Sequence, residues 1–404
     1  MKILMCHKFH FTAGGAEVYL FDLCAGLKDL GHTVINFSTQ NQKNLASRYS
    51  EYFVEPIDLS HIGSAARFIY SLESSRSIAR LIDRYHPDLA HIHNIYHQIS
   101  PSILKVLAKN SIPALMTLHD YKLICPNYSL FTQGKPCERC KGGRYYNAVR
   151  YKCLKDSYWK SSLAGLEAYF AKQLRIYEKN IALFIAPSRF LRDKMISFGL
   201  DAHKVSYLPH AINLESFKPD FELGKYILYS GNISVKKGVR LFLESLQNLN
   251  PVFAVKIAGD GPLNRDLPAL IRKLGLKNVE LLGFKSRDEL SGIMRNALFV
   301  VVPSLWPEVA GLSIYEAFAC GKCVIASSRG GIPELVEDKV NGLLFDPAEP
   351  GSLRDKISYL VSNPFRIMEF GRNGFEKISR INNRKIHYEK LTELYSGLVN
   401  KNSR

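Results

Sequence analysis

The chain has 404 residues, of which 46% are hydrophobic and 23% are charged, a composition typical of globular proteins. Its length suits two domains of about 200 residues each. No apolar stretch approaches the roughly 20 residues of a membrane-spanning helix, and residues 1–8 turn polar too early for a signal peptide. We therefore predict a cytoplasmic protein with reduced cysteines.

The strong positive charge of the chain favours anionic binding partners. The formal net charge is +17, from 54 Lys and Arg against 37 Asp and Glu. Aromatic and basic residues alternate densely between Lys141 and Lys179, a combination that suits the headgroup layer of an anionic membrane. A nucleic-acid-binding surface and a solvated basic face are the alternatives. We favour a peripheral protein on the inner face of the cell membrane, with no nucleic acid partner.

The first half of the chain alternates predicted strands and helices. Strands are expected at residues 3–6, 33–37, 89–93 and 113–118. The Gly14-Gly15 pair ends the first strand's loop, and apolar residues then recur at helical spacing as far as Gly31. This order indicates a parallel sheet covered by helices, in which ligands bind at the carboxyl ends of the strands.

A second alternating unit follows a proline-bracketed linker at residues 209–219. Its strands are expected at residues 226–230, 254–258, 279–282, 298–302 and 324–326, and the tail over 384–399 has a helical pattern. We place the domains at residues 1–215 and 216–380, with a basic insertion at 121–160 and a last helix within 381–404.

Three glycine-containing turns are candidates for holding a diphosphate. Gly14 and Gly15 open a helix, so their backbone can approach an anion closely. In the second unit, Asn232 follows a strand and Lys237 precedes the next helix. The amides of Ala310, Gly311 and Leu312 should be unpaired at a further helix N-terminus, where the helix dipole favours negative charge.

Two carboxylates flank that last helix terminus. Glu308 is expected in the loop and Glu316 in the first turns of the helix. Carboxylates repel phosphate but accept hydrogen bonds from sugar and ribose hydroxyls. Amides with acceptors on both sides fit a nucleotide-sugar, whereas the simplest alternative is two solvated surface charges.

These motifs together resemble the family 4 retaining glycosyltransferases of the GT-B fold. The resemblance extends through most of the chain and rests on seven motifs that occur in the family's order: Gly14-Gly15-Ala16-Glu17, His119-Asp120, Ala186-Pro187-Ser188, Ser230-Gly231 with Lys237-Gly238, Gly259-Asp260-Gly261-Pro262, Glu308 followed by seven residues and Glu316, and Gly330-Gly331-Ile332-Pro333-Glu334. It implies an α/β protein with two Rossmann-like parallel-sheet domains facing a central cleft. It also implies that the last helix packs back on the first domain.

The resemblance assigns roles to individual residues. Lys237 takes the place of the lysine that neutralises the leaving diphosphate, and His119 that of a histidine near the anomeric carbon of the donor. We treat His119 and Glu308 as catalytic, and one of His91 and His93 as a further candidate for the cleft. The family usually has Arg where this chain has Asn232, which removes one phosphate-binding cation.

The implied reaction is transfer of a sugar, with retention, from a nucleoside diphosphate sugar to a glycan or polyprenyl-linked glycan in cell-surface polysaccharide synthesis. No Asp-x-Asp pair occurs, so we expect a metal-independent hexosyltransferase that needs no cofactor for catalysis. A nucleotide-sugar epimerase and a basic nucleic-acid-binding protein are the alternatives.

Four cysteines lie within or near the basic insertion. Cys125, Cys137, Cys140 and Cys153 have the spacing C-x11-C-x2-C-x12-C. A set of four thiolates with a central C-x2-C suits a structural zinc ion, which would order a segment with little apolar periodicity. Against zinc, the outer spacings match no known fixed pattern. Cys320 and Cys323 also form a C-x2-C pair, but this pair spans a helix end and the next strand, and we expect buried thiols there.

Overall fold

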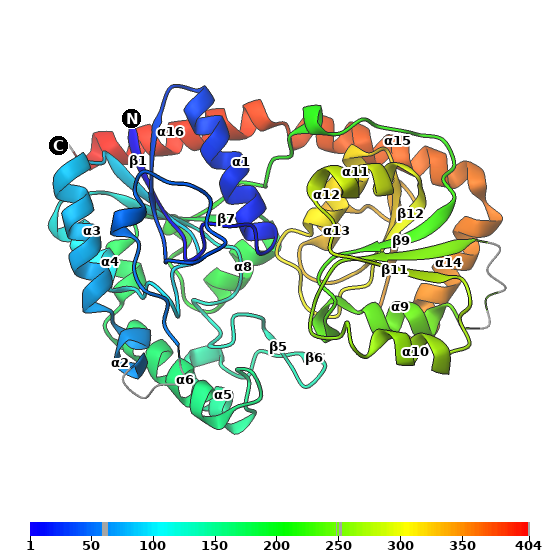
Figure 1. The fold of residues 1–404 in the computed structure, drawn as a ribbon, viewed down its shortest axis with the longest axis horizontal. Helices are drawn as coiled ribbons and strands as arrows, with labels where there is room; N and C mark the ends of the chain where they lie inside the picture. The colour runs from blue at the N-terminus through cyan, green and yellow to red at the C-terminus, as the bar shows by residue number, and fades with distance from the viewer. Residues whose placement is uncertain (59–63, 248, 250–252, 403–404) are drawn as a thin grey trace. The chain divides into compact units, whose positions relative to one another are not determined.

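The computed structural model describes residues 1–58, 64–247, 249 and 253–402 and divides the chain into two compact units. The first comprises residues 1–132, 137–208 and 388–404, and the second residues 133–136 and 209–387. Each unit contains a six-stranded sheet, parallel throughout, with helices packed around it (Figure 1). The predicted α/β class, with one parallel sheet in each half, is confirmed.

The sheet of the first unit follows the predicted apolar runs closely. Its order is β2-β1-β3-β4-β7-β8, with bounds Thr33–Phe37, Lys2–Cys6, Leu89–Ile92, Ala114–Thr117, Leu183–Ala186 and Val205–Tyr207. Strands β3 and β4 are buried along their whole length, as expected for parallel strands covered on both faces. The main helices are α1 (Gly15–Asp29), α2 (Ser64–Ile69), α3 (Leu72–Tyr85), α4 (Ser102–Lys109), α6 (Tyr158–Gln173), α7 (Ile176–Asn180) and α8 (Arg189–Ser197).

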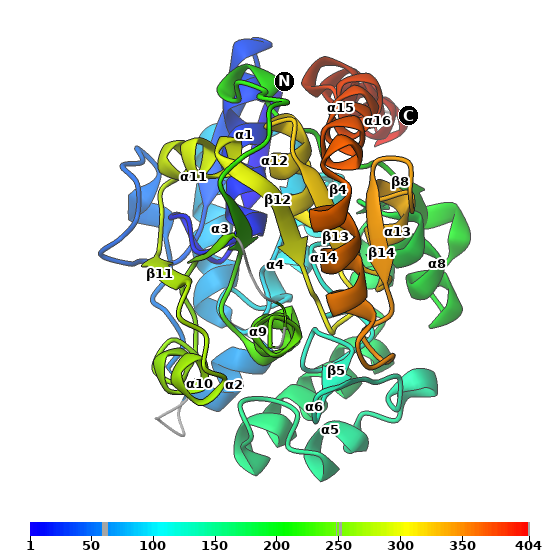
Figure 2. The ribbon, with the colours of Figure 1, turned by 90° about the vertical axis from the view of Figure 1, so that its right-hand side faces the viewer.

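The second sheet has the order β11-β10-β9-β12-β13-β14. The strand bounds are Val279–Gly283, Ala254–Ala258, Tyr226–Ser230, Ala297–Val302, Cys323–Ser327 and Gly342–Phe345. Helix α14 packs on β13 and β14 (Figure 2). The helices are α9 (Val239–Ser245), α10 (Leu267–Lys273), α11 (Arg287–Arg295), α12 (Leu312–Ala319), α13 (Ile332–Leu335), α14 (Ser352–Ser362) and α15 (Pro364–Ile381).

The insertion contains only short elements before α6 begins. These are β5 (Phe131–Thr132), β6 (Lys135–Pro136), a 3-10 turn (Lys141–Gly143) and α5 (Tyr146–Arg150). Among the described residues, the apolar cluster nearest this segment takes only Leu154 from it as a buried member, beside Phe68, Leu163 and others. Other apolar residues of the segment, among them Ile124, Leu130 and Tyr145, are buried outside this cluster.

Helix α16 (Arg384–Asn402) closes the core of the first unit from residue 388 onward. Tyr388, Leu391 and Tyr395 are buried in the same cluster as Leu20 and Leu23 of α1. The Tyr388 hydroxyl donates to the carbonyl of Asp22 at 2.8 Å. This part of α16 is thus an integral part of the first unit's core.

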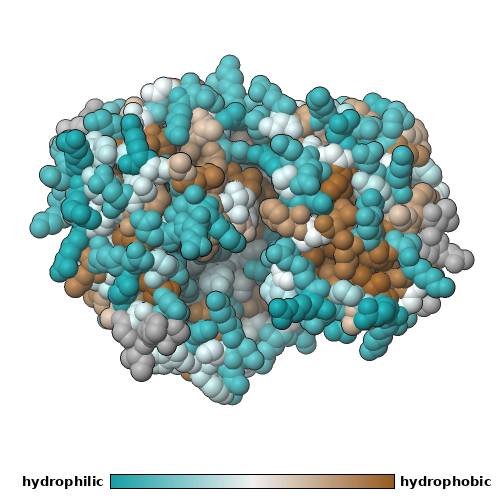
Figure 3. Space-filling view, viewed as in Figure 1, coloured by the Kyte–Doolittle hydropathy of each residue, from teal (hydrophilic) through white to brown (hydrophobic). Residues whose placement is uncertain are grey.

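The exposed apolar surface is local. In the space-filling view most of the visible surface is hydrophilic, with apolar side chains gathered over part of the second unit (Figure 3). Two large apolar residues of that unit, Leu281 and Phe284, are 39% and 71% exposed. Among the described residues no helix has the length and apolar character needed to cross a bilayer.

Truncating Leu391 tests how much the core depends on α16. Leu391→Ala should reduce the free energy of unfolding of the first unit by about 2–5 kcal/mol, because a fully buried leucine leaves a cavity. Glu393→Ala, at an exposed position of the same helix, should change it by less than about 0.5 kcal/mol. Urea unfolding, with hydrogen exchange of the β1 and β3 amides, measures both. Equal losses in the two variants would contradict the packing described here.

Candidate active site

Two loops at the carboxyl edge of the second sheet carry the charged residues of the candidate site. Strands β9 and β12 are neighbours, and each is followed by one of the loops. The loop after β9 contains the 3-10 turn Val235–Lys237, and the loop after β12 contains Glu308. The Lys236 carbonyl accepts from the amides of Leu305 and Trp306 at 2.9 and 3.2 Å. These backbone bonds hold the two loops side by side.

Gly238 makes this close approach sterically allowed. Its φ is +73°, and a Cβ atom built on it would lie 1.8 Å from the carbonyl oxygen of Pro303. Any other residue would clash with backbone that cannot move aside without separating the loops. The glycine after Lys237 therefore allows that side chain to lie over the second loop.

Lys237 and Glu308 form a partly buried ion pair. Lys237 Nζ lies 2.6 Å from Glu308 Oε1, and the Ser304 hydroxyl donates to the same carboxylate oxygen. Glu308 is only 3% exposed. Burial alone would raise the pKa of its carboxyl group, but the charge of Lys237 and hydrogen bonds from Lys237, Ser304 and Trp306 bring it below the ordinary value. Glu308 is thus a buried, ionised carboxylate rather than a solvated one.

The N-terminus of α12 lies next to this pair. Helix α12 begins at Leu312, and its N-cap is Gly311, with φ +67° and no side-chain cap. The Ser313 hydroxyl donates to the Ser230 carbonyl at 3.1 Å, which fixes the helix start beside the end of β9. Ala310 is buried in the preceding turn, and Glu316 is half-buried in the second turn of the helix. The loop position of Glu308 and the helical position of Glu316 agree with the sequence pattern.

Asn232 lies on a neighbouring turn of the same sheet edge. Its side-chain amide donates to the Asp260 carbonyl at 3.1 Å, and the residue is exposed. A neutral side chain therefore occupies this position. In the first unit, Gly14 is the N-cap of α1 and Gly15 its first residue, and both are exposed with no side-chain cap.

Burial changes the pKa values of titratable groups at the edge of the first unit's sheet. Glu17, in the first turn of α1, is 5% exposed, and its Oε1 lies 3.3 Å from His7 Nε2. Burial raises the pKa of the Glu17 carboxyl, with partial compensation by hydrogen bonds and Lys8, and lowers that of His7 to about 3. His7 is therefore neutral at neutral pH.

His119 follows β4 and contacts a second histidine. Its Nε2 lies 2.8 Å from Nδ1 of His93, and the two rings are stacked 5.1 Å apart. Part of His119 reaches solvent, yet protein surrounds its ring, and this burial together with Lys8 lowers its pKa to about 3. His119 is therefore a neutral imidazole at neutral pH.

Sequence reasoning did not identify the partners of these groups. Ser304 beside Glu308 and Glu17 beside His7 carry no distinctive spacing, and His93 was only one of two alternatives. The period of two along β3 was the available signal, because it places His91 and His93 on one face, where their rings stack 4.2 Å apart. His91 is hydrogen-bonded to Tyr395 and Thr117, whereas His93 is hydrogen-bonded to His119.

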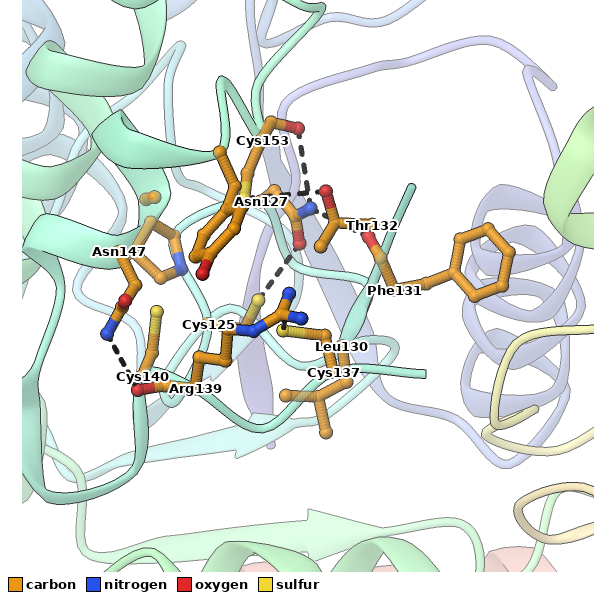
Figure 4. Close-up of a pocket in the computed structure, with 13 residues that line it drawn as sticks. Cys125, Asn127, Leu130, Phe131, Thr132, Cys137, Arg139, Cys140, Asn147 and Cys153 are labelled. Atoms are coloured by element: carbon orange, nitrogen blue, oxygen red, sulfur yellow. Dashed lines mark hydrogen bonds between the residues drawn. The ribbon is translucent and has the colours of Figure 1, made fainter. Parts of the chain in front are cut away.

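The four cysteines of the insertion line one small pocket in the first unit (Figure 4). Burial raises the pKa of Cys125 to about 11 and that of Cys140 to about 12, and also raises that of Cys153. Among the described residues no group of three or more His, Cys, Asp or Glu side chains is arranged to hold a metal ion. Cys320 and Cys323 are buried thiols in the second unit.

Known families match the chain in both units. The family described as Glycosyltransferase Family 4 matches residues 13–216, and that described as Glycosyl transferases group 1 matches residues 213–377. An uncharacterized glycosyltransferase of Methanocaldococcus jannaschii is 26% identical over 380 residues, 93% of each chain. The amylovoran biosynthesis glycosyltransferase AmsK of Erwinia amylovora is 26% identical over 247 residues, covering 58% of this chain and 60% of that protein.

Solved structures share the fold. HepE of Anabaena, determined in complex with UDP and glucose, has a TM-score of 0.70 and 21% identity, covering 98% of this chain and 100% of that one. The sucrose-phosphate synthase of Thermosynechococcus elongatus has a TM-score of 0.73 and 19% identity, covering 98% and 99%. Two parallel-sheet units of this kind are the GT-B arrangement, and with the family matches on both of them the chain belongs to glycosyltransferase family 4.

Proposed function

We propose that this glycosyltransferase moves a sugar, with retention and without a metal ion, from a nucleoside diphosphate sugar to a glycan or polyprenyl-linked glycan. The observation that carries the proposal is the Lys237–Glu308 pair beside the uncapped start of α12. It combines a cation and backbone amides for a diphosphate with a buried carboxylate for sugar hydroxyls. The Anabaena relative determined with UDP and glucose, and the relative named for amylovoran biosynthesis, support this assignment.

Donor binding would exchange the partner of Lys237. A diphosphate at the start of α12 offers more negative charge than one carboxylate, so it draws the ammonium group away from Glu308. Glu308 then loses its cation and gains sugar hydroxyls as hydrogen-bond donors. Glu316, one turn further into the helix, is the second acceptor and would bind the ribose. In this scheme the ion pair holds both side chains in place until the donor arrives.

Retention is proposed to proceed by attack on the face from which the diphosphate leaves. A double displacement needs a carboxylate nucleophile beneath the sugar. Glu308 instead forms an ion pair with Lys237 and accepts a hydrogen bond from Ser304. It is better suited to accepting hydrogen bonds from sugar hydroxyls. The departing phosphate oxygen takes the proton of the acceptor hydroxyl. His119, as a neutral imidazole, positions the donor sugar and the acceptor by hydrogen bonding.

Lys237→Met tests the diphosphate role. Turnover should fall by at least ~100-fold, because the charge that offsets the leaving group is lost. The variant should also be less stable, because Glu308 is left buried and ionised without its cation. The measurement is release of nucleoside diphosphate, in the presence of EDTA, from the donor that a thermal-shift panel of UDP-, GDP- and ADP-sugars identifies.

Two further variants separate the catalytic role of Lys237 from its structural one. Lys237→Met combined with Glu308→Gln removes both charges and should regain stability but not turnover. Arg240→Gln, an exposed cation on α9, should leave turnover within about twofold of wild type. Unchanged turnover in Lys237→Met would refute the role of the lysine, and a strict magnesium requirement would refute the metal-free mechanism.

The two carboxylates should respond differently to neutralisation. Glu316→Gln should mainly raise the KM for the donor, because an amide accepts ribose hydroxyl hydrogen bonds less strongly than a carboxylate. Glu308→Gln should mainly lower kcat, if the hydrogen bonds from the sugar hydroxyls to Glu308 strengthen as the sugar moves during transfer. Steady-state kinetics with the natural donor distinguish these patterns. The reverse outcome would mean that the sugar and ribose ends of the donor are exchanged in this scheme.

We also propose that the protein binds an anionic membrane through α5 and α6. Helix α6 carries Trp159, Leu166 and Tyr169 on one exposed face, at 48%, 57% and 42% exposure. Spacings of seven and three residues place them on one stripe. This stripe is accompanied by basic residues that are mostly exposed: Lys141, Arg144, Arg150, Lys152, Lys155, Lys160, Lys172, Arg175 and Lys179.

Acidic residues do little to offset this surface. Glu167 is buried and paired with Lys122, Glu178 is paired with Lys172, and Asp156 is exposed. The aromatic content is smaller than the sequence pattern indicates, because Tyr145 and Tyr177 are only 5% and 6% exposed and pack inward. The stripe of one Trp, one Leu and one Tyr remains on the surface among cations, and Tyr146 and Tyr158 are exposed as well, which suits a headgroup layer.

Vesicle binding tests this surface. Replacing Arg144, Arg150 and Lys155 by Gln should weaken binding to phosphatidylglycerol-containing vesicles on the order of 100-fold, since each cation contributes roughly 1 kcal/mol. Trp159→Ser with Leu166→Ser should weaken it as well, whereas Leu281→Ser with Phe284→Ser, an exposed apolar pair of the second unit, should not. Equal binding to neutral and anionic vesicles would contradict the electrostatic part of the proposal.

A further inference from the structure

The cysteine pocket brings together thiols from distant points of the chain. Cys125 ends a turn before β5, Cys137 and Cys140 precede the 3-10 turn, and Cys153 follows α5. All four line the same pocket, whose cavity of about 10 Å³ has room for about one water molecule (Figure 4). A space of this size excludes an organic ligand but suits a single ion.

The chemistry of the lining narrows the choice of ion. Besides the cysteines, the pocket is lined by apolar and uncharged polar side chains and by Arg139, with no Asp, Glu or His. Four soft thiolates without carboxylates favour zinc over calcium or magnesium. Arg139 Nη1 lies 3.7 Å from Cys137 Sγ, where its charge would offset the excess negative charge of a tetrathiolate site.

Several residues around the pocket have strained backbone conformations. Among the described residues with positive φ that are not glycine, Tyr128, Leu130, Gln133, Lys152, Lys155 and Asp156 belong to this segment. Such conformations persist only where the surroundings fix them. Part of the support here is polar: the Asn127 side chain accepts from Cys125 Sγ and donates to the carbonyls of Phe131 and Cys153. A ligand bonded to all four cysteines would stabilise these same turns.

We propose that Cys125, Cys137, Cys140 and Cys153 together bind one structural zinc ion, which orders the segment before α6. As they stand, the thiols are not drawn to one point: Cys125 donates to Asn127 at 2.9 Å and Cys153 to Thr132 at 3.6 Å. Binding replaces these weak bonds by four Zn–S bonds and releases the four thiol protons to solvent. The less buried Cys137 and Cys153 give the ion a path inward to Cys125 and Cys140.

Metal analysis of the full chain tests this directly. Protein purified under reducing conditions without chelator should carry about one zinc per chain. Exchange for cobalt(II) should give the visible absorption of a tetrahedral thiolate site. These two measurements need no variant, so they remain decisive if a substitution prevents folding. Protein with four reduced thiols and less than about a tenth of an equivalent of metal, or protein with these cysteines joined in disulfides, would overturn the proposal.

A matched pair of variants locates the site. Cys137→Ser with Cys140→Ser should abolish zinc binding and speed protease cleavage within residues 125–157 at least tenfold. Cys320→Ser with Cys323→Ser changes the chain's other C-x2-C pair, which lies buried in the second unit, and should leave the zinc content unchanged. Loss of zinc only in the second variant would place the metal elsewhere. Transferase turnover does not enter either readout, so the outcome is independent of the proposed reaction.

Discussion

The approach of Gly238 to the Pro303 carbonyl is the constraint on which the candidate site depends. It allows the turn after β9 to lie against the turn after β12, and the backbone bonds from Lys236 to Leu305 and Trp306 secure the contact. Only then can Lys237 reach Glu308. A carboxylate that is 3% exposed stays ionised only with a cation or several donors beside it, so the steric and electrostatic features require each other.

Much of the second sheet could be predicted because its strands are continuous apolar runs. The run at residues 226–230 matches β9 to the residue. The strands β7 and β14 were not predicted, whereas β3 and β4, which are equally short, were. The pairing of Lys237 with Glu308 could not be predicted either. It depends on β9 and β12 being neighbours, which is a property of strand order that no local pattern contains.

The insertion shows the limit of composition as evidence. Basic and aromatic residues alternate throughout residues 141–179, yet the helical register sends Trp159 and Tyr169 outward while Tyr145 and Tyr177 pack inward. Composition alone assigned all four to one surface. In the same way, the cysteine spacing predicted a cluster of four thiols, but only the fold shows that Asn127 and Arg139 line the same pocket. Side-chain direction is decided by packing and not by residue type.

The candidate residues of the two units differ in their charge states. The second unit offers the ionised pair Lys237 and Glu308, whereas His119 and His7 in the first unit have pKa values near 3 and stay neutral. A base of that strength is too weak to deprotonate a sugar hydroxyl effectively near neutral pH. The pKa of Glu308 is also lowered from its ordinary value, so this carboxylate is a weak base as well. Among these groups none suits general base catalysis, so in the proposed mechanism the leaving phosphate oxygen is the group that accepts the proton, on the face where the acceptor attacks.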